Sequence, residues 1–244
     1  MKFGNAAGNR KPDLEVALRN QIETYGMTTR LVWEHSAALS EFSASEISGC
    51  LRTLTKSGDV EAHPLHHGRF YFTFTPQHKL RTTDTRWRGG AFGENQKIKL
   101  FAKLLVGTIY IPGSIPCTAQ QLAKLLGDQD HGLSTQFLIH TEQKKAFYLQ
   151  VDTSLHARPS RTAQRLREVV FRLAKLPTVK HMVKQRQFEL VLIAVTAQRA
   201  ESILNHFRRY DRVGCTPIRV LVLPELMALL SSIPIGGNFR KLLE

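Results

Sequence analysis

The sequence predicts an α+β domain followed by an α/β domain with a mixed sheet, on three observations. Apolar residues recur at helical spacing from residue 13 to 58, and the spacing then changes to the alternation of a hairpin up to residue 76. From residue 97 onward, helical patterns alternate with apolar strand patterns. Residues 77–96 are rich in Gly, Thr and Arg and show no periodicity. We therefore expect one domain over 13–76, a linker over 77–96 and a second domain over 97–244.

Three helical segments precede the first hairpin. The first begins at Asp13 and stops at Gly26, the second covers "TTRLVWEH", and the third begins at a capping box of Ser43 and Glu46. The strands "VEAHP" and "RFYFTFT" then flank the polar segment "LHHG". Three helices followed by a hairpin is the order of a winged helix-turn-helix domain, which is our prediction for residues 13–76.

The second half has a hairpin followed by helix-linked strands. We expect helices at "KIKLFAKLLVG" and "TAQQLAKLLG", a hairpin turning at residues 142–145, and a helix over 160–176. The strand "FELVLIAV", the helix "AESILNHFRRY", the strand "IRVLVLP" and the helix "ELMALL" follow. This order indicates parallel strands added to an antiparallel pair, with helices covering the sheet.

The charge of the chain favours a polyanionic partner. Lys and Arg number 34 against 20 Asp and Glu, which gives a formal net charge of +14, and nucleic acid is the commonest polyanion. The three cysteines are far apart in sequence and fit neither a disulfide framework nor a zinc site. No apolar run approaches the ~20 residues that a membrane span needs. We expect a cytoplasmic protein with no membrane partner.

The third helix of a winged helix-turn-helix domain enters the major groove of DNA. Opposite its apolar stripe this helix would present Ser45, Ser48, Arg52, Thr53 and Lys56, and we expect these side chains to contact double-stranded DNA. The alternative is a solvated helix face in a domain that pairs with protein. In "HPLHHGR" we expect His67 and Arg69 to lie near phosphate at the hairpin tip. A zinc site there would lack its fourth ligand, so no metal is predicted.

The helix over 160–176 carries a basic face. Its cations include Arg161, Arg165 and Arg172, and Glu168 is the one acid among the basic residues from 158 to 187. The face is either an ordinary solvated surface or a second surface that contacts a polyanion. No GxxxxGK[ST], GxSxG or HExxH motif occurs, so we predict neither catalytic residues nor a cofactor.

The predicted winged helix, followed by "LSTQFLIHTEQKKAFYLQVDTS", a helix, "FELVLIAVTAQRAESILNHF" and "IRVLVLPEL", resembles the replication-relaxation family of plasmid and conjugative-element proteins. The resemblance covers most of residues 13–230. It implies a winged helix joined to a PD-(D/E)XK nuclease-like, or restriction-endonuclease-like, α/β core.

Catalysis in that core needs an Asp on one strand and an (Asp/Glu)-x-Lys motif on the next. The resemblance places Thr135 at the first position, Gln150 at the acidic position and Asp152 where the Lys would stand, so the site is degenerate. One carboxylate among neutral neighbours is a poor magnesium site. We therefore expect Asp152 to cap the following loop or helix by accepting backbone N–H bonds.

These observations support a DNA-binding protein of a mobile element that regulates or assists plasmid replication, transfer or transcription. Its partners would be double-stranded DNA and either a second copy of itself or a replication or mobilisation protein. One alternative is a divergent metal-dependent nuclease that uses Asp152 with Asp128, Asp130 or Glu142. Another is a transcriptional regulator that senses a ligand.

Overall fold

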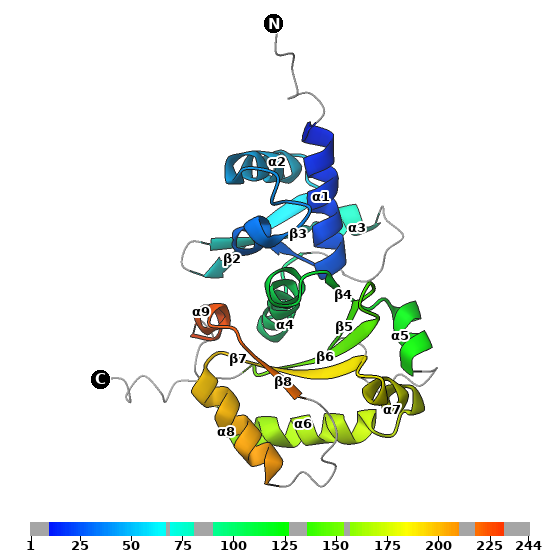
Figure 1. Ribbon diagram of the computed structural model, residues 1–244. Coiled ribbons are helices and arrows are strands. Elements are labelled where there is room, and N and C mark those ends of the chain that lie inside the picture. The colour runs from blue at the N-terminus through cyan, green and yellow to red at the C-terminus, as the bar shows by residue number, and fades with distance from the viewer. Residues whose placement is uncertain are drawn as a thin grey trace, which may run out of the picture. The chain divides into compact units, whose positions relative to one another are not determined.

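The computed structural model describes residues 10–66, 69–80, 90–126, 136–153, 157–209 and 218–231. Its contacts divide the chain into two compact units, each with helices and a sheet (Figure 1). The first unit comprises residues 1–93 and 103–115, and the second comprises residues 94–102 and 116–244. This division assigns 103–115 to the first unit although the sequence suggested a second domain over 97–244.

The first unit is built from helices around a three-stranded antiparallel sheet. Helix α1 (Arg10–Tyr25) leads to β1 (Thr28–Thr29) and to the 3₁₀ helix η1 (Arg30–His35). Helix α2 (Ala44–Lys56) precedes strands β2 (Val60–His66) and β3 (Arg69–Phe74), and the strand order is β1-β3-β2. Helix α3 (Pro76–Leu80) follows β3, and the π-helical turn η2 (Val106–Tyr110) closes the unit.

The core of this unit lies between α1, α2 and the sheet. Three side chains of α1 and three of α2 are almost fully buried, together with Tyr71 of β3: Leu14, Leu18, Ile22, Ile47, Leu51 and Leu54. The capping box is confirmed, because the Ser43 side chain accepts from Glu46 N and the Glu46 side chain accepts from Ser43 N. This reciprocal pair fixes where α2 begins.

The predicted helix over "TTRLVWEH" is wrong in its first part. Thr28 and Thr29 are extended and pair with Phe72 and Tyr71 of β3. The residues after them, Arg30–His35, form one 3₁₀ helix. The two β-branched residues are better accommodated in a sheet than in a helix. The hydroxyl of Thr28 also donates to Gln21 Oε1 at 2.7 Å, which holds this strand against α1.

A buried tyrosine joins two distant segments of the first unit. The Tyr25 hydroxyl donates to the Ser114 carbonyl at 2.9 Å, and burial raises the pKa of Tyr25 to about 12. A Cβ at Gly107 would collide with both the Tyr25 hydroxyl and the Ser114 carbonyl. The close approach therefore requires glycine at this position.

The second sheet is a mixed five-stranded sheet in the order β4-β5-β6-β7-β8. Its strands are β4 (Ser114–Pro116), β5 (Phe137–His140), β6 (Lys145–Val151), β7 (Phe188–Ala194) and β8 (Ile218–Val222). Strand β5 pairs antiparallel with β6, whereas β7 pairs parallel with both β6 and β8. The predicted hairpin and parallel strands are thus confirmed; β4 was not predicted.

Helices α6 (Pro159–Leu173), α7 (Pro177–Lys184) and α8 (Ala197–Arg208) cover one face of this sheet (Figure 1). They enclose a core that includes Tyr148, Leu166, Val170 and Phe188. Helix α4 (Glu94–Leu105), α5 (Ala119–Leu126) and α9 (Glu225–Ser231) complete the fold. The predicted helix over 160–176 ends at Leu173, and a second helix begins at Pro177, a residue type that favours the first turn of a helix.

The predicted linker contains helical residues at both ends, since α3 extends to Leu80 and α4 begins at Glu94. Residues 81–89 lie outside the described part of the chain. The predicted domain boundaries concern parts of the chain that fold independently, so they stay predictions. Among the described residues, no helix is both long enough and apolar enough to cross a membrane.

Candidate nucleic-acid interface

The exposed face of α2 carries every side chain that the sequence assigned to it. Ser45, Ser48, Arg52, Thr53 and Lys56 are all exposed, whereas Ile47, Leu51 and Leu54 on the opposite side are buried. The positions recur every three or four residues, so that they form one continuous surface along the helix. We call this surface the α2 face.

The hydroxyls of the α2 face are turned toward their own helix. Ser48 Oγ donates to the Ala44 carbonyl at 2.7 Å, and Thr53 Oγ1 donates to the Gly49 carbonyl at 3.2 Å. These bonds use the hydroxyl protons and leave the oxygen lone pairs toward the surface. In this rotamer the two hydroxyls can accept hydrogen bonds from amino groups on base edges, while Arg52 and Lys56 supply the positive charge.

Gly49 lies within the α2 face, and the sequence analysis did not single it out. A Cβ built on Gly49 meets no atom within 4 Å, so no packing requirement in the chain explains the glycine. A glycine inside a helix costs roughly 1 kcal/mol relative to alanine. Gly49 lies among the exposed residues at 45, 48 and 52 and has no side chain, so a ligand can approach the helix backbone closely at this position.

The one acidic residue of α2 is held at the start of the helix. The Glu46 carboxylate accepts from Ser43 N at 2.8 Å and from Ser43 Oγ at 2.7 Å. The cap therefore holds this negative charge beside the helix N-terminus, where the helix dipole stabilises it. The C-terminal half of the α2 face keeps the two positive charges of Arg52 and Lys56.

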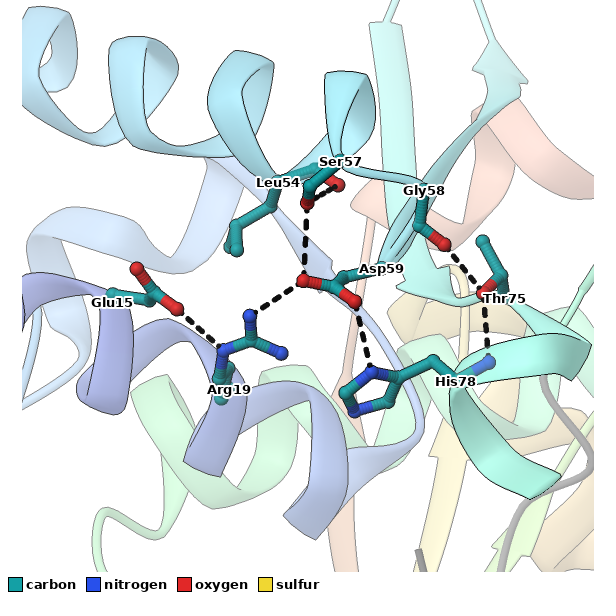
Figure 2. A network of polar contacts seen from close by, with 8 residues as sticks. All are labelled: Glu15, Arg19, Leu54, Ser57, Gly58, Asp59, Thr75 and His78. Atoms are coloured by element: carbon teal, nitrogen blue, oxygen red, sulfur yellow. Dashed lines mark hydrogen bonds and ion pairs between the residues drawn. The ribbon is translucent and has the colours of Figure 1, made fainter. Parts of the chain in front are cut away.

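A network around Asp59 holds α2 in place within the first unit (Figure 2). The Asp59 carboxylate accepts from Arg19 of α1 at 2.8 Å and from Ser57 Oγ at 3.1 Å, and it lies 3.2 Å from His78 Nδ1 of α3. Arg19 also bonds Glu15 at 2.9 Å. The hydrogen bond from Arg19 is the main reason why the pKa of Asp59 lies below its ordinary value. The network ties the C-terminal end of α2 to α1 and α3.

Of the two hairpin residues predicted to contact DNA, Arg69 lies in the part of the chain that the structure describes. Arg69 is exposed at the start of β3 and lines a cavity of about 530 Å³, together with Arg30, Trp33, Phe70 and Phe72 among others. Phe70 is 49% exposed, which is unusual for a large apolar side chain on a sheet. His67 lies outside the described residues. The structure thus gives Arg69 an aromatic surrounding that the sequence did not suggest.

Asp152 forms a buried ion pair that the sequence did not suggest. Its side chain is 3% exposed and lies just after β6. Oδ2 accepts from Arg199 Nε of α8 at 2.7 Å, and Oδ1 accepts from Thr162 Oγ1 of α6 at 3.0 Å. These bonds join the end of β6 to two helices. The predicted capping of the following loop stays a prediction, because residues 154–156 lie outside the described part of the chain.

The remaining positions of the degenerate site are only partly described. Gln150 is half-buried on β6, pairs in register with Leu192, and precedes Asp152 by two residues. Thr135 lies outside the described residues, as do Asp128 and Asp130. Glu142 is exposed in the turn between β5 and β6. In the part of the chain that the structure describes, no three His, Cys, Asp or Glu side chains are grouped to hold a metal ion.

The three basic residues predicted on the helix over 160–176 are all exposed on α6. Arg161 lines a cavity of about 760 Å³ at the start of this helix, whereas Arg165 and Arg172 are not among the residues that line that cavity. Arg172 Nε donates to the Glu168 carbonyl at 3.4 Å. Its charge also lies near Tyr148, where it opposes the burial that raises the pKa of Tyr148 to about 12. The basic face is therefore divided into an N-terminal part at the cavity and a part that lies further along the helix.

Comparison with protein-family models, with curated proteins and with solved structures finds no match for this chain. The resemblance to the replication-relaxation family stays a prediction.

Proposed function

We propose that the chain binds double-stranded DNA through the α2 face and that the first unit acts as a winged helix-turn-helix domain. The observation that carries the proposal is the composition of the α2 face, which combines small hydroxyl residues and the open space over Gly49 with Arg52 and Lys56. Small residues let a helix approach the floor of the major groove, and the cations contact phosphate or guanine. The order α1, η1, α2, β2, β3 supports the winged-helix assignment.

In this proposal the α2 face enters the major groove and the β2–β3 hairpin lies along the neighbouring backbone. Arg69, at the start of β3, then contacts phosphate, and the sequence predicts the same for His67, which lies outside the described residues. The chain has 34 basic and 20 acidic residues. The resulting positive charge supports this assignment, because it attracts the polyanion before the specific contacts form.

The biological role that best agrees with the sequence is regulation or assistance of plasmid replication, transfer or transcription in a mobile element. The resemblance to the replication-relaxation family supports this role, and the protein would act in the cytoplasm as a homodimer or with a replication or mobilisation protein. The second unit then serves as a nuclease-like core without catalysis. The engagement of Asp152 by Arg199 supports that assignment, since an ion-paired carboxylate is poorly available to a metal.

Substitution of Arg52 tests the proposal. Fluorescence anisotropy with labelled duplexes should show that Arg52→Ala weakens binding to a preferred sequence by about 1–3 kcal/mol if Arg52 reads a base. An equal loss on all sequences would identify Arg52 as a phosphate contact instead.

Lys180→Ala is the matched control, because it removes one exposed positive charge from α7. It should leave duplex affinity nearly unchanged. If Lys180→Ala and Arg52→Ala weaken binding equally, the α2 face is not the interface.

A further inference from the structure

A second cluster of cations converges on a cavity in the second unit. The cavity measures about 760 Å³ and lies between the N-terminal part of α6 and the end of α8. Arg158, Arg161 and Arg167 line it from α6 and its N-cap, and His206 and Arg209 line it from α8 and its C-cap. None of the described residues that line the cavity is acidic.

The guanidinium groups of Arg158, Arg161 and Arg209 around one cavity repel one another, and this repulsion opposes folding. An anion in the cavity would remove the repulsion and would therefore stabilise the folded chain. The planar donor fork of arginine matches phosphate oxygens in two-point hydrogen bonds. A single phosphate carries at most about two negative charges, fewer than the positive charges of these three arginines, so the cluster fits a ligand with two or more linked phosphates.

The other lining residues indicate which part of the ligand is recognised. Among the described residues they include Ser160, whose hydroxyl can donate to a phosphate oxygen, but no Phe, Tyr or Trp and no large apolar side chain. The imidazole of His206 is the one aromatic ring among these residues, so a base would find little surface to stack on. Recognition then rests mainly on the phosphates.

The start of α6 adds a favourable dipole at the same place. The N-cap residue Arg158 makes no side-chain cap, whereas Ser43 caps α2 and Thr196 caps α8. The positive end of the α6 dipole is thus not capped by the side chain of its own N-cap residue, and it adds to the attraction exerted by the arginines.

From this convergence of charges we infer that the cavity between α6 and α8 binds linked phosphate groups. The ligand is either a free nucleoside polyphosphate or the sugar–phosphate backbone of a nucleic acid, which present the same chemistry. The site is separate from the α2 face, and it stands whether or not the α2 face binds DNA.

A matched pair of double variants of the full chain tests the inference. The test variant Arg161→Gln/Arg209→Gln removes two exposed cations from the cavity. The control Arg165→Gln/Arg208→Gln removes two exposed cations from the same two helices outside the lining. Because all four side chains are exposed, neither variant should unfold the chain. In the absence of ligand the control should keep the wild-type melting temperature, and the test variant should match or exceed it, since it relieves the repulsion in the cavity.

The first arm measures binding of tripolyphosphate and of ATP by calorimetry at constant ionic strength. If a free nucleotide is the source, wild type and control bind both probes with one saturable site, and the test variant binds at least about tenfold more weakly. The second arm measures affinity for a DNA duplex. If nucleic acid is the source, the test variant loses at least about tenfold in duplex affinity relative to the control.

A third measurement needs no variant. Phenylglyoxal modifies accessible arginines, and the sites are mapped by mass spectrometry with and without the probe that binds. Protection of Arg161 and Arg209, with none at Arg165 and Arg208, supports the site. Equal behaviour of the two double variants in both arms, or equal protection of all four arginines, would overturn the inference. Its failure is distinguishable from that of the proposed function, which depends on substitutions in α2.

Discussion

At the scale of single residues, the buried ion pair of Asp152 and Arg199 bears on the stability of the second unit. The exposed fraction is 3% for the Asp152 side chain and 13% for that of Arg199. Removing one partner of a buried pair is costly, because the other charge loses its counterion away from water. Asp152 thus joins β6 to α6 and α8 and bears on stability.

Asp152→Asn should lower the free energy of unfolding by about 3 kcal/mol, more than the ~1 kcal/mol of a lost helix cap. Urea denaturation measures the loss. The double variant Asp152→Asn/Arg199→Gln should lose clearly less than the sum of the single losses, since each single variant already breaks the same pair. Additive losses would show that the two side chains do not depend on each other.

The stability of the first unit depends on pH through the carboxylate of Asp59. Its pKa is lowered in the folded state, mainly by Arg19, so folding favours the ionised form. The stabilisation is fully present above the unfolded pKa of about 3.9 and is lost as pH falls through the lower folded pKa. Asp59→Asn should therefore destabilise the protein at pH 7, and the difference from wild type should shrink below about pH 4.

Urea unfolding of both proteins at several pH values measures this difference, with the exposed Asp13→Asn as the control. A difference that stays constant down to the lowest pH would mean that the charge of Asp59 is not what stabilises the fold.

At the scale of helices and strands, local signals in the sequence were reliable where the structure is determined locally. The capping box of Ser43 and Glu46 lies within one turn, and it correctly marked the start of α2. Thr28 and Thr29 were misassigned because their state depends on pairing with β3, far along the chain. Two further features depend on contacts between residues distant in sequence: Asp152 bonds to Arg199, and Arg161 lines the same cavity as Arg209. No local sequence pattern encodes such long-range contacts.

The α2 face could be listed from the sequence because helical periodicity alone separates exposed from buried positions. Gly49 could not be interpreted, since only the structure shows that the space above it is open. Gly49→Ala should raise the free energy of unfolding by about 0.5–1 kcal/mol, because alanine restricts the unfolded chain and meets no neighbour. Denaturation with urea measures this gain.

The longer variant Gly49→Gln should fold as stably as Gly49→Ala to within about 0.5 kcal/mol and yet bind duplex DNA more weakly. Its side chain would fill the space through which DNA approaches α2. Wild-type affinity in Gly49→Gln would mean that nothing approaches this part of the helix.

At the scale of the whole molecule, the two units place cations on two surfaces. The first unit carries the α2 face and the second carries the cavity between α6 and α8, and the chain as a whole has a formal charge of +14. Both surfaces favour anions through the same arginine chemistry. Long-range attraction by the net charge would speed encounter with DNA, and the surfaces would then determine where the polyanion is held.

The salt dependence of duplex affinity tests the central claim of DNA binding most directly. Each phosphate that the protein neutralises releases counterion, so the logarithm of the association constant falls with the logarithm of salt concentration by about 0.9 per phosphate. For the full chain we predict a linear decrease with a slope that corresponds to roughly four or more phosphates, or a loss of on the order of 100-fold between about 50 and 200 mM salt. No measurable binding at the lower concentration, or an affinity that does not change over this range, would contradict the account.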